Sequence, residues 1–127
     1  DREVRCVGWN GMCQLGPTDE IWGRARLEGL HGSVSLTLGG GHACALDPEG
    51  AVQCWGSNHR AQLGRGQRGP SDCSPAPVPG LRATQLAAGA AHTCALDAGG
   101  EVWCWGNGAM GQLGDGDAWR ERPVPVR

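Results

Sequence analysis

Residues 88–114 read AGAAHTCALDAGGEVWCWGNGAMGQLG, and residues 38–64, fifty positions earlier, read LGGGHACALDPEGAVQCWGSNHRAQLG. Aligned without gaps, the two segments are identical at 14 of 27 positions. A third, partial copy opens the chain, with VRCVG at 4–8 and GMCQLG at 11–16. Self-similarity at this period is typical of solenoids and β-propellers. We therefore divide the chain, as a single propeller segment, into the tail of one repeat (1–16), two fuller repeats (17–64 and 65–114) and the start of another (115–127).

Each repeat predicts a β-hairpin. Residues 92–96 and 101–105 are short strand-like runs, and the turn-rich residues 97–100 separate them. Alternation along the second run puts Cys104 on one face and its two Trp neighbours on the other. Gly and Pro interrupt every window long enough for a stable helix. The sequence therefore predicts an all-β fold of β-propeller blades, about 2.5 repeats of roughly 50 residues in an incomplete ring. An ordinary β-sandwich is the alternative, but it would not require so regular a repeat.

The composition limits the classes of protein that fit. Gly and Pro account for 23 and 8 of the 127 residues, yet the net charge is only −2 and the chain holds six Trp and seven Cys. A folded, cross-linked chain fits these numbers better than a disordered one. No apolar run approaches the roughly 20 residues that span a bilayer, so membrane insertion is not expected. The eleven basic residues are all Arg, scattered and outnumbered by acids, so nucleic-acid binding is not expected either.

The cysteines of the two fuller repeats predict disulfides. The antiparallel register of the hairpin places Cys94 directly opposite Cys104, and the earlier repeat places Cys44 opposite Cys54. Side chains at such positions lie close to the spacing that a disulfide needs. Closing so short a loop contributes about 3 kcal/mol in the chain-entropy model. Two disulfides imply an oxidising compartment, so we expect a secreted or periplasmic protein.

Three further cysteines have no assigned partner in the sequence. Cys6 occupies the repeat position of Cys54, and it could pair with Cys13 or Cys73. Cys13 could instead pair with Cys73 between the loops of neighbouring repeats. Seven is an odd number, so at least one thiol is free or bonded outside the chain.

Metal binding or redox chemistry is the alternative explanation for the cysteines and histidines of the hairpins. Each hairpin could offer an imidazole and two thiolates to zinc, but the usual Cys-x-x-Cys spacing and a fourth ligand are missing. Trp103-Cys104-Trp105 could carry electrons only if it were covalently modified. No Ser-His-Asp arrangement or phosphate-binding loop is apparent, so we expect neither an enzyme nor a cofactor. The residues weighed for a metal are His42, Cys44, Cys54, His92, Cys94 and Cys104.

The motifs of the last repeat resemble the regulator-of-chromosome-condensation repeat, in the cysteine-bearing version common in secreted bacterial proteins. They are HTCAL at 92–96, GEVWCWG at 100–106, GQLGDG at 111–116 and PVPV at 123–126. The earlier repeat follows the pattern more loosely. The resemblance covers nearly the whole chain and implies a β-propeller, typically a ring of about seven blades.

This chain has too few repeats for such a ring. It begins in mid-repeat and stops before another His-Thr-Cys strand. We expect either a fragment of a longer propeller or copies that assemble and complete each other's blades, because open strand edges are a liability. A lone monomer of three blades is the state that we expect least.

The resemblance implies a binding or scaffold module for a protein partner. Family members include a guanine-nucleotide exchange factor, a secreted β-lactamase inhibitor and a plant ultraviolet-B receptor, so a secreted enzyme inhibitor is an alternative. Exchange-factor activity fits poorly with disulfide-linked hairpins. Trp and Arg are enriched at binding hot spots, and the loops at 16–26, 58–74 and 115–122 supply both. The candidate partner-binding residues are Trp22, His59, Arg60, Arg65, Arg68 and Trp119.

Overall fold

The computed structural model describes residues 3–18, 21–30, 32–108 and 119–126 of the chain. These residues form strands and turns and no helix, so none of them belongs to a helix that could cross a membrane. The strands are β1 (Val4–Trp9), β2 (Trp22–Leu27), β3 (Ser35–Leu38), β4 (His42–Leu46), β5 (Ala51–Gly56), β6 (Asp72–Arg82), β7 (Gln85–Ala88), β8 (His92–Leu96), β9 (Val102–Asn107) and β10 (Trp119–Pro125).

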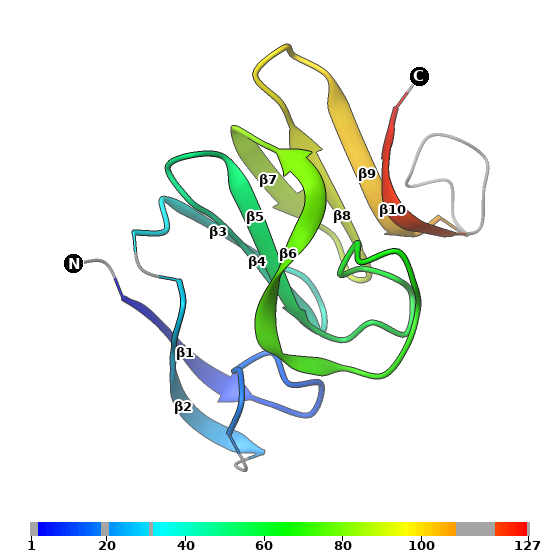
Figure 1. Ribbon diagram of the computed structural model, residues 1–127. Helices are drawn as coiled ribbons and strands as arrows, with labels where there is room; N and C mark the ends of the chain where they lie inside the picture. Colours follow the sequence, from blue (N-terminus) through cyan, green and yellow to red (C-terminus); the bar gives the residue numbers. More distant parts are fainter. Residues whose placement is uncertain (1–2, 19–20, 31, 109–118, 127) are drawn as a thin grey trace.

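The strands make three antiparallel sheets that follow one another along the chain (Figure 1). The first, blade 1, contains β1 and β2. Blade 2 has the strand order β3-β4-β5-β6, and blade 3 has the order β7-β8-β9-β10. Within the described residues the three blades do not close into a ring. This repeated four-strand meander confirms the prediction of an all-β, partial propeller.

A repeated turn fixes the central hairpin of each complete blade. In blade 2, a carboxylate oxygen of Asp47 accepts hydrogen bonds from the backbone N–H groups of Glu49 and Ala51, each over 2.9 Å. Gly50 closes the turn with φ +91°, which glycine adopts without steric cost. Asp97 accepts the two equivalent hydrogen bonds in blade 3. The side chain of an Asx turn therefore sets where each second strand begins.

The hairpin register decides which cysteines meet. Cys44 lies opposite Cys54 in the β4–β5 pair, and Cys94 lies opposite Cys104 in the β8–β9 pair. Both pairs form disulfides. They join neighbouring strands inside a blade and do not connect one blade to another.

Two buried tryptophans hold successive blades together. Trp55 and Trp105 are completely buried. The indole N–H of Trp55 donates to the carbonyl of Gln14 in blade 1, and that of Trp105 donates to the carbonyl of Gln62 in blade 2, both over 2.9 Å. The cores between blades are therefore built around one indole each, with the polar end of the ring satisfied by the preceding blade.

The sequence pattern showed only two of the four strands in a blade. The inner strands β3 and β7 and the outer strands β6 and β10 lie outside the two strand-like runs that the sequence predicts for each repeat. The outer strand β6 holds Pro75 and Pro77 and pairs with β5 through register shifts. Proline is tolerated there because one side of an edge strand makes no backbone hydrogen bonds to another strand. The complete blades span 35–82 and 85–125, so their limits are offset from the sequence repeats.

Candidate functional site

The loop between β5 and β6 is shaped by one asparagine. The side chain of Asn58 donates to the carbonyl of Gln67 over 3.0 Å and accepts from the N–H of Leu63 over 3.3 Å. Its backbone carbonyl accepts from the N–H of Gly69 over 3.1 Å. These contacts bring the two halves of the loop together, so that the exposed turn at 59–60 lies beside residue 69.

The same loop presses against the start of β10. The guanidinium of Arg68 lies 3.8 Å from the centroid of the Trp119 ring, a cation–π contact. The N–H of Gly66 donates to the carbonyl of Glu121 over 2.8 Å. Arg122 passes over Gly66, where an added Cβ would come within 2.9 Å of the Arg122 Nε. A loop of blade 2 and a strand of blade 3 therefore form one continuous surface.

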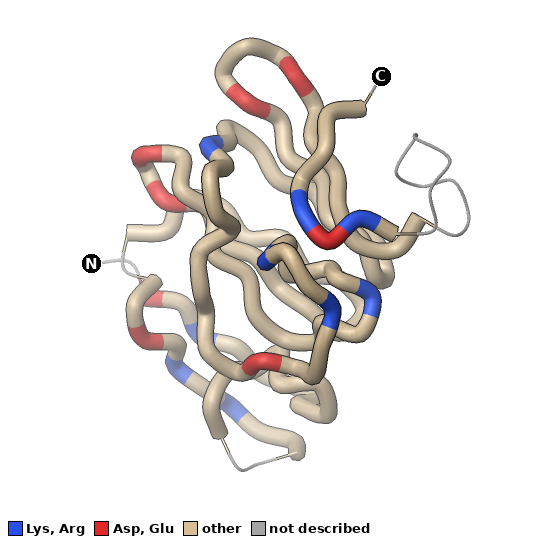
Figure 2. The backbone as a smooth tube through the Cα atoms, turned by 45° about the vertical axis from the view of Figure 1, so that its right-hand side comes forward, with Lys and Arg blue, Asp and Glu red and all other residues tan. Residues whose placement is uncertain are grey.

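We call this surface the Arg–Trp patch. Figure 2 shows that basic segments of the loop and of β10 lie on the same side of the molecule. The loop contributes an exposed His and two exposed Arg, and β10 contributes an exposed Trp and two more Arg. Its acid, Glu121, is half-buried. Among the described residues of this surface, basic side chains therefore outnumber acidic ones, and one aromatic ring contacts Arg68. The residues of the patch are His59, Arg60, Arg68, Trp119, Arg120 and Arg122.

Arg65, a predicted partner-binding residue, is used inside the chain. Its side chain is only 17% exposed. It pairs with Asp72 and donates to the carbonyls of Cys54 and, over 3.2 Å, Ser74. The pKa of Asp72 is held below its usual range by the backbone N–H of Ser74 first and by Arg65 second. Arg65 fixes where β6 begins, and its hydrogen bonds and ion pair are made inside the chain.

Trp22 lies in another part of the molecule. It stands on β2 opposite Trp9, and its side chain is 71% exposed. The strand alternation puts Arg5, Arg24 and Arg26 on the same open face. Sequence reasoning missed this group because it treated the arginines as scattered. The R-x-R spacing at 24–26 was the signal that could have revealed it.

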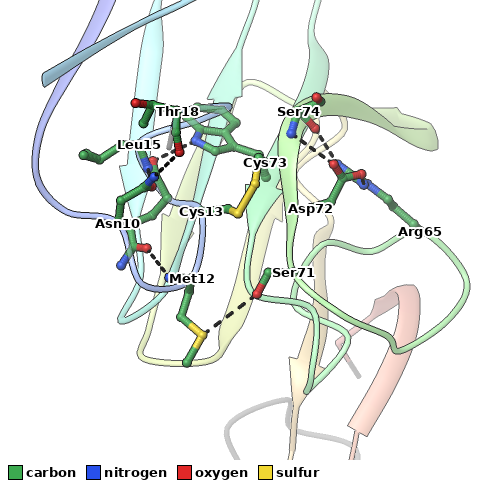
Figure 3. Close-up of a disulfide and its surroundings, with 12 residues drawn as sticks. Asn10, Met12, Cys13, Leu15, Thr18, Arg65, Ser71, Asp72, Cys73 and Ser74 are labelled. Atoms are coloured by element: carbon green, nitrogen blue, oxygen red, sulfur yellow. Dashed lines mark hydrogen bonds and ion pairs between the residues drawn. A yellow bond between two sulfur atoms is a disulfide. The ribbon is translucent and has the colours of Figure 1, made fainter. Parts of the chain in front are cut away.

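A third disulfide joins blade 1 to blade 2. Cys13, in the loop after β1, is bonded to Cys73 in β6, 60 residues away in sequence. Figure 3 shows the bond beside Met12 and Ser71, whose hydroxyl lies 3.9 Å from the Met12 sulfur. Of the pairings left open by the sequence, this is the one that the structure contains.

Cys6 is the cysteine that is left unbonded in the described part of the chain. It is half-buried and packs against the core between blades 1 and 2. Burial raises the pKa of its thiol. At neutral pH it is therefore protonated and weakly nucleophilic.

His42, weighed above as a metal ligand, is a buried structural residue. Its Nε2 lies 2.9 Å from the Thr93 hydroxyl, and that hydroxyl donates to the carbonyl of Gln62 over 3.1 Å. Nε2 therefore carries the proton, and Nδ1 has no hydrogen-bond partner among the described residues. Burial, with the nearby His92 second, lowers the pKa of His42 to about 4. The neutral ring links blade 2 to blade 3.

The described residues contain no group of three or more His, Cys, Asp or Glu side chains that could hold a metal ion. The cysteines of both hairpins are bonded to each other, so the thiolates weighed for zinc are engaged. The Trp103 indole donates to the carboxylate of Asp97 over 3.0 Å, which gives that ring a structural role.

Comparison with known families gives matches over most of the chain. Two models described as "Regulator of chromosome condensation (RCC1) repeat" match it, one at residues 34–62 and 83–112, the other at 49–96 and 99–127. No curated protein sequence matched the chain.

Solved structures show the same arrangement of strands. Human WBSCR16 superposes with a TM-score of 0.83 at 24% identity, over 100% of this chain and 35% of that one. Yeast RCC1 (Prp20) bound to Kap60 gives 0.80 at 28% identity, over 98% and 34%. Prp20p from Saccharomyces cerevisiae, which binds Gsp1p and histones, gives 0.81 at 28% identity, again over 98% and 34%. The chain spans about a third of the length of these proteins.

Proposed function

The chain belongs to the regulator-of-chromosome-condensation (RCC1) repeat family, and from this premise we propose that it is a non-catalytic module that binds a protein partner. The observation that carries the proposal is the Arg–Trp patch, where a loop of blade 2 and the first residues of β10 meet across a cation–π contact. Trp and Arg are the residue types that most often dominate binding energy at protein interfaces.

The patch is built in advance of binding. Asn58 closes the loop, Arg65 fixes its exit into β6, and the Cys44–Cys54 bond holds the blade beneath it. A surface ordered in this way loses little conformational entropy when a partner binds. The exposed Arg60, Arg68 and Arg122 favour a partner that presents acidic side chains, which would speed association at low salt.

The relatives support protein binding as the general mode. Yeast RCC1 (Prp20) binds Kap60, Gsp1p and histones. Because this chain spans about a third of that protein, we carry over the mode of action and not those partners.

We also propose that the module works in an oxidising compartment, secreted or periplasmic. Three disulfides support this proposal, since such bonds are rare in the cytosol. Thiol titration of the unfolded protein taken from its source should find one free thiol. Seven free thiols would overturn the assignment.

Photo-crosslinking tests the proposed binding surface. A photoreactive amino acid in place of exposed His59 should capture a protein from extracts of the source, and one in place of exposed Ala98, in the β8–β9 turn, should not. The captured protein is then purified and its affinity measured. We expect R60A/R68A to weaken binding at least tenfold at 50 mM salt and the matched variant R24A, on blade 1, to change it less than twofold. Equal capture at both positions, or equal affinity of R60A/R68A and wild type, would overturn the proposal.

A further inference from the structure

A groove crosses the seam between blades 2 and 3. It consists of two adjoining hollows, of about 320 Å³ and about 380 Å³, which share Pro79 and Gly80 of β6. β6 lines the groove from blade 2, and β9, β10 and the β8–β9 turn line it from blade 3. Both blades have all four strands, so the groove does not depend on where the chain begins or ends.

The smaller hollow is basic. Arg65, from the β5–β6 loop, and Arg122, from β10, line it together with three glycines, whose lack of side chains leaves it open. Asp72 pairs with Arg65, but among the described residues no hydrogen bond or ion pair engages the guanidinium of Arg122. The Arg65 Nε is buried and also has no hydrogen-bond partner there. Unused guanidinium donors from two blades beside one hollow form a site for a carboxylate.

The larger hollow is mainly apolar. Trp103, Leu81 and Pro123 line it, and the indole N–H of Trp103 is already taken up by the carboxylate of Asp97. The two charged residues of this hollow, Asp97 and Arg82, have opposite signs and offset each other. Grooves lined by aromatic and apolar side chains are typical binding sites for proline-rich segments in the polyproline II conformation.

We propose that this groove binds an extended, proline-rich segment of a partner protein, with an acidic side chain of the segment at Arg122 and its prolines against Trp103. This inference rests on the proposed protein-binding function and names the kind of segment that is recognised beside the Arg–Trp patch. Charge complementarity selects the acidic residue, and the apolar lining selects the prolines. Proline has no N–H that would be left unpaired in the apolar hollow. A proline-rich segment is also extended before it binds, so it loses little conformational entropy.

Nuclear magnetic resonance of the ¹⁵N-labelled protein tests the proposal with a defined probe. The probe is the peptide Ac-GEPPPPG-NH2, whose run of prolines covers more than one spacing between the two hollows. We expect a saturable shift of the amide signals of Gly66 and Gly80 and of the indole N–H signal of Trp103. The indole signal of Trp55, which is buried between blades 1 and 2, should stay in place. The absence of a saturable shift up to 5 mM peptide would overturn the proposal.

Two matched peptides test the two hollows separately. Ac-GQPPPPG-NH2 lacks the carboxylate and Ac-GESSSSG-NH2 lacks the prolines, and we expect each to bind at least fivefold more weakly than the probe. Affinity equal to that of the probe, for either peptide, would contradict the assigned chemistry. Sodium acetate at the same concentrations should leave the Trp103 signal in place. If acetate reproduced the shifts of the probe, the groove would be a simple anion site and the segment proposal would fail.

Protein variants locate the binding surface. R122A removes an exposed side chain without a partner, so the fold should be kept while the affinity for the probe falls at least fivefold. The matched variant R24A, on blade 1, should change it less than twofold, and an R122A protein that binds like wild type would refute the proposal.

The double variant R60A/R68A distinguishes the groove from the rest of the Arg–Trp patch. It should bind the probe like wild type, because neither arginine lines the groove. Loss of probe binding in this variant would place the site outside the groove and overturn the inference. Failure of crosslinking at His59 with intact probe binding would instead count against the proposed patch alone.

Discussion

Trp105 of blade 3 donates its indole N–H to the backbone carbonyl of Gln62 in blade 2, over 2.9 Å. The Thr93 hydroxyl donates to the same carbonyl over 3.1 Å. One blade earlier, Trp55 makes the equivalent contact with the carbonyl of Gln14. The Trp-Gly motif of one repeat and the Gln-Leu-Gly motif of the previous repeat are thus two halves of one joint, which explains why both recur in the sequence.

Replacing Trp105 should show how much of this joint is packing and how much is hydrogen bonding. Trp105→Phe keeps most of the ring but loses the N–H, and we expect it to lower the free energy of unfolding by about 1 kcal/mol. Trp105→Ala also leaves a cavity and should cost about 3–5 kcal/mol. Urea unfolding measures both. Exposed Trp119 is the control, and Trp119→Phe should cost less than about 0.5 kcal/mol. If the two Phe variants lowered the free energy of unfolding equally, the hydrogen bond from Trp105 to Gln62 would not stabilise the contact between blades 2 and 3.

Much of the fold could be predicted because the repeat constrains it locally. The turn at Asp97 and the register that follows place Cys94 opposite Cys104, and both are visible as short-range patterns. The outer strands were not predicted, because their prolines read as breakers and a long loop, not a short turn, joins each of them to the strand that it pairs with. Pro77 in β6 is tolerated because that strand is at the edge of its sheet.

The candidate site could be predicted only in part. Arg68 and Trp119 were both proposed from residue type, but their contact needs the loop closure by Asn58 that brings residue 69 back to the loop's start. Arg65 looks like its neighbour Arg68 in the sequence, and only the three-dimensional position of Asp72 shows that it is used internally. Side-chain direction in a loop depends on such tertiary contacts, and sequence spacing does not contain them.

The free energy of unfolding should decrease on acidification, over a pH range set by the pKa of His42 in the folded and unfolded chain. Its pKa is about 4 in the fold and 6.5 as the ordinary value, so between these pH values the unfolded chain binds a proton that the fold excludes. The free energy of unfolding therefore decreases as pH falls from 6.5 to 4, by at most about 3 kcal/mol, and this contribution levels off below pH 4.

Urea unfolding at a series of pH values checks this expectation. His42→Gln, which retains an N–H donor for Thr93, should flatten the slope between pH 6.5 and 4 even if it lowers stability at pH 7. His59→Gln, at an exposed position, should leave the slope as in wild type. A slope that persists unchanged in His42→Gln would show that another group is responsible.

The Cys13–Cys73 disulfide should contribute strongly to the free energy of unfolding, although Cys13 lies in a loop. It closes a segment of 60 residues, for which the chain-entropy model gives about 4 kcal/mol. We expect C13A/C73A to lose stability of that order and to raise amide exchange most strongly in β1 and β2, which the bond fastens to blade 2. Chemical unfolding and hydrogen exchange report on the two effects. Unchanged exchange in blade 1 would mean that the Trp55 core alone holds it.

The repeat also predicts where a second bridge between blades can be added. Cys13 and Ala61 hold equivalent positions in their loops, with φ of 66° and 64°. Asp72 and Arg120 both lie opposite the glycine that ends the motif, Gly56 and Gly106, so Glu121 is the counterpart of Cys73. We therefore expect A61C/E121C to form a disulfide between blades 2 and 3.

The new bond would close another 60-residue segment and raise the free energy of unfolding by up to about 4 kcal/mol. Intact mass before and after thiol alkylation detects the bond, and urea unfolding with and without reductant measures its effect. A61C/E101C, whose second cysteine follows the β8–β9 turn, is the matched control and should keep both added thiols free. Two free thiols in A61C/E121C would show that the joints between blades 1 and 2 and between blades 2 and 3 are not equivalent.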